Sequence, residues 1–142
     1  MADELSGRCH CGATSYTATG DIVGGGICFC SNCQGIGGGG PNYALSLTNY
    51  MVSVKGEPKV YSHPGGTGEM IDKTFCANCG VHLLAQGGGN SHLLRVKAGT
   101  LDDPNLYQPM AQLWTSDARA WHTLNPDLPA FGRNPPGMAG EK

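Results

Sequence analysis

The sequence predicts a mainly β domain with very little helix. Glycine accounts for 23 of the 142 residues and proline for nine, which predicts many short elements joined by tight turns. Several short segments also alternate apolar with polar residues, as strands with one buried face do. Hydrophobic residues make up 39% of the chain and charged residues only 14%, which excludes a disordered protein. We therefore expect one domain over residues 1–131, followed by a flexible C-terminal tail over residues 132–142.

Alternating and β-branched segments define the expected strands in the first half of the chain. These strands cover residues 14–19, 22–29, 42–47, 51–54 and 59–62. The tetrapeptide KGEP lies between the last two of them and contains turn-forming residues. We therefore expect residues 51–54 and 59–62 to form a hairpin.

The second half continues in the same way. The expected strands cover residues 70–75, 81–86, 92–98 and 109–114. The loop GGGNS separates the second and third of these strands, which predicts another hairpin. SDARAW, residues 116–121, is the one segment in which we expect a helical turn.

The seven cysteines indicate metal binding more than disulfide formation. An odd number does not satisfy a disulfide framework, and cysteines one residue apart rarely meet the geometry of a disulfide. The cysteines fall into three groups, CHC at residues 9–11, CFCSNC at 28–33 and CANC at 76–79. Two thiolates one or two residues apart can reach one tetrahedral ion together. The spacing therefore favours metal sites.

Residues 76–80, CANCG, are the strongest metal-binding pattern in the chain. In a Cys-x-x-Cys-Gly turn, backbone N–H groups point at the sulfurs, and glycine takes the left-handed conformation that this requires. The CHC pair is the natural source of two further thiols, so that one ion would clamp two hairpin tips and contribute folding free energy directly. A site with four thiolates is closed. We therefore expect a structural ion to be held by Cys9, Cys11, Cys76 and Cys79.

CFCSNC contains the three remaining thiols. Three protein ligands with an open fourth position are the arrangement of a catalytic zinc ion. We therefore expect Cys28, Cys30 and Cys33 to form a catalytic site. The sequence leaves alternatives to this assignment. The segment is also compatible with a redox dithiol or an incidental site.

Other ligand sets and metals are chemically possible as well. Cys9 and Cys11 could pair with Cys28 and Cys30, and iron in a four-thiolate site would give the protein colour. The five histidines show no ligand spacing among themselves, so we expect them at the surface or in packing positions. The alternative for His10 and His63 is a position beside the metal ligands.

Charge and hydropathy narrow the range of partners. The formal net charge is -2 and no basic run is present, so the sequence does not favour a nucleic-acid partner. No apolar segment approaches the roughly 18 residues of a membrane span, and the acidic start MADELSGR is unlike a signal peptide. We expect a cytoplasmic protein with reduced thiols and small-molecule partners. The sequence is compatible with a monomer and with a homo-oligomer.

With the cysteine pattern established, the chain resembles the glutathione-dependent formaldehyde-activating enzyme (Gfa-like) family, which also includes centromere protein V. The resemblance runs from Gly7 to Phe131 and is carried by GRCHCGATSY, CFCSNCQ, KTFCANCG, VKAGTLDDP and AW…LPAF. It implies a zinc-bound coil of several small antiparallel β-sheets. Two residues depart from the family pattern. Phe29 stands where histidine is frequent, and Gln34 stands where arginine is common.

The resemblance also implies two zinc ions and an activity. The family's structural ligands match Cys9, Cys11, Cys76 and Cys79, and its catalytic ligands match Cys28, Cys30 and Cys33. The implied enzyme is a carbon–sulfur lyase that joins a thiol, plausibly glutathione, to formaldehyde or another small aldehyde, as an S-(hydroxymethyl)glutathione synthase does. The alternative is a non-enzymatic module of the same fold that binds zinc for stability or senses thiols.

Overall fold

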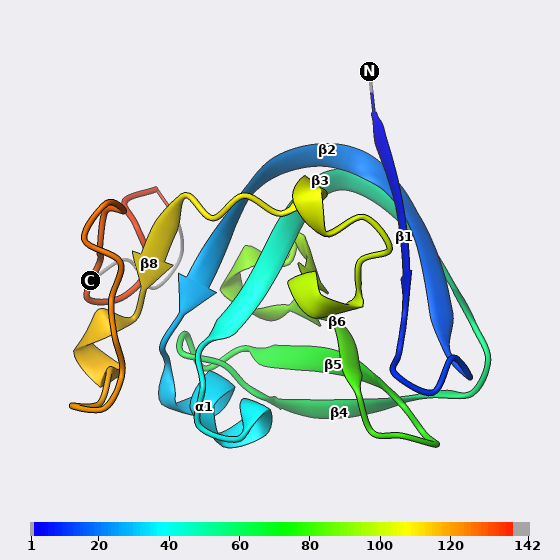
Figure 1. Cartoon of the computed structure of the whole chain (residues 1–142), viewed down its shortest axis with the longest axis horizontal. Coiled ribbons are helices and arrows are strands. Elements are labelled where there is room, and N and C mark those ends of the chain that lie inside the picture. The colour runs from blue at the N-terminus through cyan, green and yellow to red at the C-terminus, as the bar shows by residue number, and fades with distance from the viewer. Residues whose placement is uncertain (1, 138–142) are drawn as a thin grey trace.

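The computed structural model describes residues 2–137 and contains one curved eight-stranded sheet, with a short helix at one end (Figure 1). Seven strands follow the order β1-β2-β3-β7-β6-β5-β4, and β8 pairs with β2. The strands are β1 (Asp3–Arg8), β2 (Ser15–Cys28), β3 (Asn42–Lys55), β4 (Pro58–Pro64), β5 (Met70–Cys76), β6 (His82–Gly87), β7 (Leu94–Lys97) and β8 (Ala111–Leu113). The helix α1 spans Ser31–Gly37. Within the described residues, no helix is long and apolar enough to cross a membrane.

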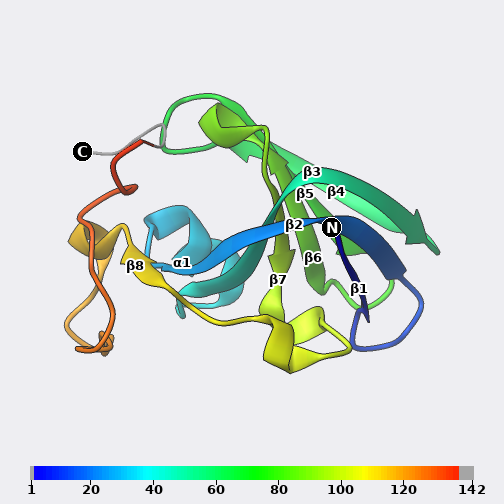
Figure 2. The ribbon, with the colours of Figure 1, turned by 90° about the horizontal axis from the view of Figure 1, so that it is seen from above.

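The mainly β class with little helix is therefore confirmed. The expected small sheets are joined into one hydrogen-bonded path, because β2 and β3 are each 14 residues long and connect the two halves. The register of this pair shifts between Thr19 and Asp21, where Asn49 on the opposite strand has a φ of 50°. Such a β-bulge lets a strand bend without ending. The two long strands consequently arch over the molecule (Figure 2).

The expected hairpin of residues 51–54 and 59–62 is wrong. The second half of β3 returns along the start of β2, where Val54 lies opposite Tyr16, and β4 pairs with β5 instead. Long strands offer a partner with many more ladder hydrogen bonds than a four-residue hairpin. The hairpin of β6 and β7 is confirmed, with Leu84 opposite Val96. The N-terminal strand β1 was not predicted.

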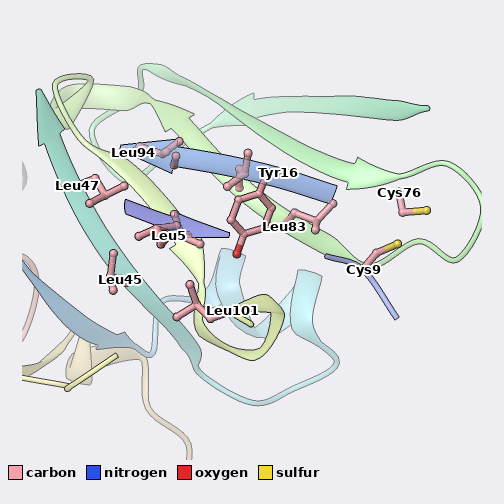
Figure 3. Close-up of a cluster of buried hydrophobic side chains, with 12 residues drawn as sticks. Leu5, Cys9, Tyr16, Leu45, Leu47, Cys76, Leu83, Leu94 and Leu101 are labelled. Carbon is pink, nitrogen blue, oxygen red and sulfur yellow. The ribbon is translucent and has the colours of Figure 1, made fainter. Parts of the chain in front are cut away.

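The core lies on one face of this sheet (Figure 3). Alternation along β3 and β7 places Leu45, Leu47, Leu94 and Val96 on this face, where each is at most 1% exposed. Cysteines at the ends of two strands extend the cluster at one end (Figure 3). The intervening residues of β3 and β7 point to the opposite face, which forms the floor of the cavity described below.

The C-terminal segment packs alongside β8, at one end of the sheet, and is joined to it by backbone hydrogen bonds. The backbone of Gln112 exchanges hydrogen bonds with Pro129 and Phe131. Within the predicted tail, Asn134 accepts a hydrogen bond from the Trp114 indole, and the Arg133 guanidinium lies 4.4 Å from the centre of that ring. The start of the predicted tail is therefore anchored, whereas residues 138–142 lie outside the described residues.

We expect Gly56→Ala to destabilise the fold by about 2–4 kcal/mol, because two penalties combine. Gly56 has a φ of 100°, and an added Cβ would collide with the carbonyl oxygen of Ala13. Gly99→Ala is the matched control, since a Cβ there meets open space and no positive φ is required. Denaturant unfolding of the two variants in the same buffer measures the difference. Equal stabilities would show that the turn adapts to the extra atom.

Candidate metal centres and the cavity beside them

The seven thiols lie in two separate groups, one of four and one of three. Cys9, Cys11, Cys76 and Cys79 form the closed cluster, and Cys28, Cys30 and Cys33 form the open cluster. Within each cluster all sulfur atoms lie within 4.8 Å of one another. Among the described residues, no histidine or carboxylate joins either group.

The closed cluster brings together thiols from two turns that lie 65 residues apart in the chain. One pair of its thiols follows β1, and the other comes from the last residue of β5 and the turn after it. Cys9 and Cys76 are 3% and 1% exposed, and their side chains lie together at one end of the core (Figure 3). In the sheet order β1 and β5 are separated by four strands. The cluster therefore closes the curved sheet on itself.

Backbone donors surround the sulfurs of the closed cluster. The N–H of Thr14 points at Cys9 Sγ at 3.3 Å, and the N–H of Asn78 points at Cys76 Sγ at 3.3 Å. Gly80 has a φ of 78°, the left-handed conformation expected for the Cys-x-x-Cys-Gly turn. Backbone hydrogen bonds lower the pKa of Cys79. Four converging thiols, three of which accept hydrogen bonds from backbone N–H groups, fit a tetrahedral metal ion.

The open cluster is built from the end of a strand and the start of a helix. Cys28 is the last residue of β2, Cys30 caps α1, and Cys33 lies in its first turn. Extended residues alternate sides, so Cys28 and Cys30 share one side while Phe29 points the other way. The helical turn then returns Cys33 to the first two thiols, and its N–H donates to Cys30 Sγ at 3.3 Å. The end of β2 agrees with the expected strand over residues 22–29, whereas the helix α1 was not predicted. The strand and helix hold the three thiols in an ordered segment.

Phe29 and Gln34 hold this cluster in place. Phe29 is 2% exposed and packs edge-on against the His122 ring at 5.3 Å. The Gln34 amide donates to the carbonyl oxygens of Phe29 at 2.6 Å and Asp117 at 2.9 Å. Arg119 donates to the other end of the Gln34 amide. The C-terminal segment is thereby joined to the open cluster.

Hydrogen bonds among the three thiols favour the charged form of Cys30 and raise the pKa of Cys28. Contacts with the Cys28 and Cys33 thiols, and more weakly the charge of Lys73, lower the pKa of Cys30 to about 2. All three side chains are partly exposed and border a cavity. Three thiols on one side and open space on the other fit an ion with a free coordination position.

The cavity has a volume of about 220 Å³ and lies over the face of the sheet opposite the core. Its floor consists of small residues, Ala44 and Ser46 of β3 and Ala85 of β6. The register places Ala85 between Lys73 of β5 and Arg95 of β7. Paired residues of adjacent strands share a face. Small side chains thus leave room above the sheet, and long cationic ones flank it.

The cavity is strongly cationic. Lys73, Arg95 and Lys97 all line it, and Lys73 is only 8% exposed. Burial lowers the pKa of Arg95 and of Lys97. Burial and the charges of Lys97 and Lys73 also lower the pKa of His82 to about 4, so its ring is neutral at pH 7.

The sequence indicated the thiols but not the three cations or His82. His82 and the more deeply buried His63 line the cavity. His82 was expected at the surface or in a packing position, whereas a position beside the metal ligands was the alternative for His63. Lys73 lies in a different segment from Arg95 and Lys97, and the three cations form no run of charges in the sequence. One signal was present. In HLLRVKA, Leu94 and Val96 alternate with Arg95 and Lys97, which places the two cations together on the face away from the core.

Comparison with known proteins agrees with this architecture. A model of the family described as glutathione-dependent formaldehyde-activating enzyme matches residues 4–117. A crystal structure of a Rhodobacter sphaeroides protein is similar, with a TM-score of 0.54 at 23% identity, over 73% of this chain and 96% of that one. No curated protein matches the chain. Because the family model spans most of the sequence, including both cysteine clusters, the chain belongs to the glutathione-dependent formaldehyde-activating enzyme family.

Proposed function

We propose that this protein is a zinc enzyme that adds a thiol to formaldehyde or another small aldehyde, with glutathione as the plausible thiol and a cytoplasmic location. The reaction is of the carbon–sulfur lyase type. A carbon–sulfur bond forms, the carbonyl π bond opens, and the thiol proton is transferred to the resulting oxygen. The product is an S-hydroxymethyl adduct.

The observation that carries the proposal is the difference between the two clusters. Four thiols enclose one position at the end of the core, whereas three thiols border the 220 Å³ cavity. In the proposal, Cys9, Cys11, Cys76 and Cys79 hold a structural zinc ion, and Cys28, Cys30 and Cys33 hold a catalytic one. Bound there, zinc supplies a Lewis acid that stabilises a thiolate or polarises a carbonyl.

The remaining contributions come from the chain itself. Lys73, Arg95 and Lys97 produce a positive potential in the cavity, which favours the thiolate form of an entering thiol. The small residues of the floor leave space for a reactant beside the open cluster. His63 Nδ1 lies 2.9 Å from the Pro64 carbonyl oxygen, to which it donates in one tautomer. In that tautomer His63 Nε2, which has no hydrogen-bond partner among the described residues, can accept the thiol proton.

Exchange spectroscopy of glutathione and formaldehyde, with and without protein, tests this function. We expect the zinc-loaded protein to accelerate exchange between free and adduct forms, and Cys33→Ser to remove the acceleration. Metal analysis should give up to two zinc ions per chain. Unchanged exchange with both sites filled would favour the non-enzymatic module. A stoichiometry that never exceeds one in zinc-replete, reducing buffer would reject the open site.

A further inference from the structure

The cavity contains more positive charge than the negative charge of the open cluster can balance. Three thiolates around a divalent ion carry one net negative charge. Asp117 supplies the one carboxylate among the described residues that line the cavity, and its Oδ2 accepts a hydrogen bond from the Ser31 N–H. Lys73, Arg95 and Lys97 therefore face two negative charges. A buried cation without a counter-charge is costly, so an excess of this kind indicates a missing anion.

Lys73 is the cavity cation whose hydrogen-bonding capacity is least used, although its charge acts on Cys30. Its side chain is more than nine-tenths buried and lines the cavity, and its ammonium has no hydrogen bond or salt bridge to residues 2–137. The other two cations are anchored. Arg95 Nη2 donates to the Gly87 carbonyl oxygen at 3.2 Å, and Lys97 Nζ donates to Asn42 Oδ1. Lys73 thus keeps all three donors for a ligand.

The sheet register places two of these cations around one small patch of floor. Lys73 and Arg95 lie opposite the same residue, Ala85, on its two neighbouring strands. Two long cationic side chains on either side of an alanine leave a gap that polar atoms of a ligand can fill. His63 and His82 add further unpartnered groups, since the buried Nε2 of the first and Nδ1 of the second have no hydrogen-bond partner among the described residues.

We propose that the cavity recognises a carboxylate on the reactant that enters the open cluster, with Lys73 and Arg95 as the carboxylate-binding residues and Lys97 adding positive potential. A planar carboxylate accepts several hydrogen bonds at once, which suits a guanidinium and an ammonium on either side of it. A neutral thiol or formaldehyde alone leaves these cations unpaired. The inference rests on the proposed function only in taking the reactant to be a thiol or an aldehyde.

The carboxylate has two possible sources, and paired probes distinguish them. Calorimetric titration of the zinc-loaded protein compares 3-mercaptopropionate with 2-mercaptoethanol, and glyoxylate with acetaldehyde. Each pair shares its reactive group and differs in the carboxylate. We expect the acid of at least one pair to bind about 10- to 100-fold more tightly than its neutral partner, as for hydrogen bonds to charged groups. The pair that shows the preference identifies the source. Propionate should compete with the preferred acid.

Substitutions test which side chains carry the preference. Lys73→Met and Arg95→Met are expected to reduce the preference to about onefold. The affinity for the neutral thiol falls less than that for the acid, because both cations also favour its thiolate form. Lys59→Met is the matched control, because Lys59 lies on β4 with an exposed side chain and does not line the cavity. Zinc content and circular dichroism establish that each variant is folded. If one of the two cavity variants does not fold, the other still tests the inference.

Two results would overturn the inference. The first is equal binding of acid and neutral probes in both pairs. The second is an unchanged preference in folded Lys73→Met and Arg95→Met proteins. These titrations contain one reactant at a time, so they do not depend on catalysis. A protein that prefers the acid but does not accelerate exchange would retain the carboxylate site and lose the proposed enzyme function.

Discussion

Cys79→Ser is expected to abolish soluble folding. The closed cluster joins the turn after β1 to the turn after β5, which lie at distant positions in the sheet order. A metal ion held there contributes on the order of 10 kcal/mol to folding, and losing one of four thiolates forfeits much of it. That loss is comparable with the whole stability of a typical domain, about 5–15 kcal/mol. The variant should therefore be found in inclusion bodies or be degraded.

Cys33→Ser is the contrasting substitution, and we expect its fold to remain largely intact. The open cluster is formed by residues 28–33, so a metal ion there closes no long-range contact. Phe29 packing and the Gln34 hydrogen bonds keep the segment attached when a thiol is lost. Soluble yield, far-UV circular dichroism and zinc content distinguish the variants. His10→Ser is the control for a substitution within the closed-cluster segment, because His10 is exposed and contributes no ligand. Equal unfolding of both cysteine variants would contradict the division of roles.

The thiol motifs could be recognised in the sequence because the spacing within each motif is local, although the sequence left open which motifs share an ion. CANCG contains the two thiols, the spacing and the left-handed glycine of its own turn, and the structure has Gly80 at a φ of 78°. CFCSNC contains all three thiols of the open cluster. The cationic cavity could not be predicted in the same way. Lys73 and Arg95 lie on either side of Ala85 only because the register of three strands pairs both of them with it.

The errors in the fold have a similar cause. The segments around Gly20 and Asn49 contain turn-forming residues, which predicted strand ends at both places. In the structure they form the bulge at which β2 and β3 bend together, and the strands continue. Whether glycine ends a strand or bends it depends on the partner strand, which a single segment does not contain. The wrong hairpin partner for residues 51–54 followed from the same error.

The two clusters are also expected to differ in how readily they lose metal. In the closed cluster, Cys9 and Cys76 are at most 3% exposed and belong to turns far apart in the chain. Releasing an ion requires these turns to separate, so loss of metal is coupled to unfolding. The three thiols of the open cluster are partly exposed and border the cavity, which gives a chelator or oxidant a direct approach.

Brief chelator treatment or mild peroxide should therefore release about one zinc ion per chain, while far-UV circular dichroism stays unchanged. Once the ion has left, Cys30 and Cys33 have the two-residue spacing of redox Cys-x-x-Cys motifs and can form a disulfide. Thiol labelling followed by mass spectrometry locates the first event. Cys11 is exposed, so its labelling is also monitored. Because its ion is held by three other thiolates, we expect it to react later. Modification of Cys76 and Cys79 before Cys30 and Cys33 would require the structural and catalytic labels to be exchanged.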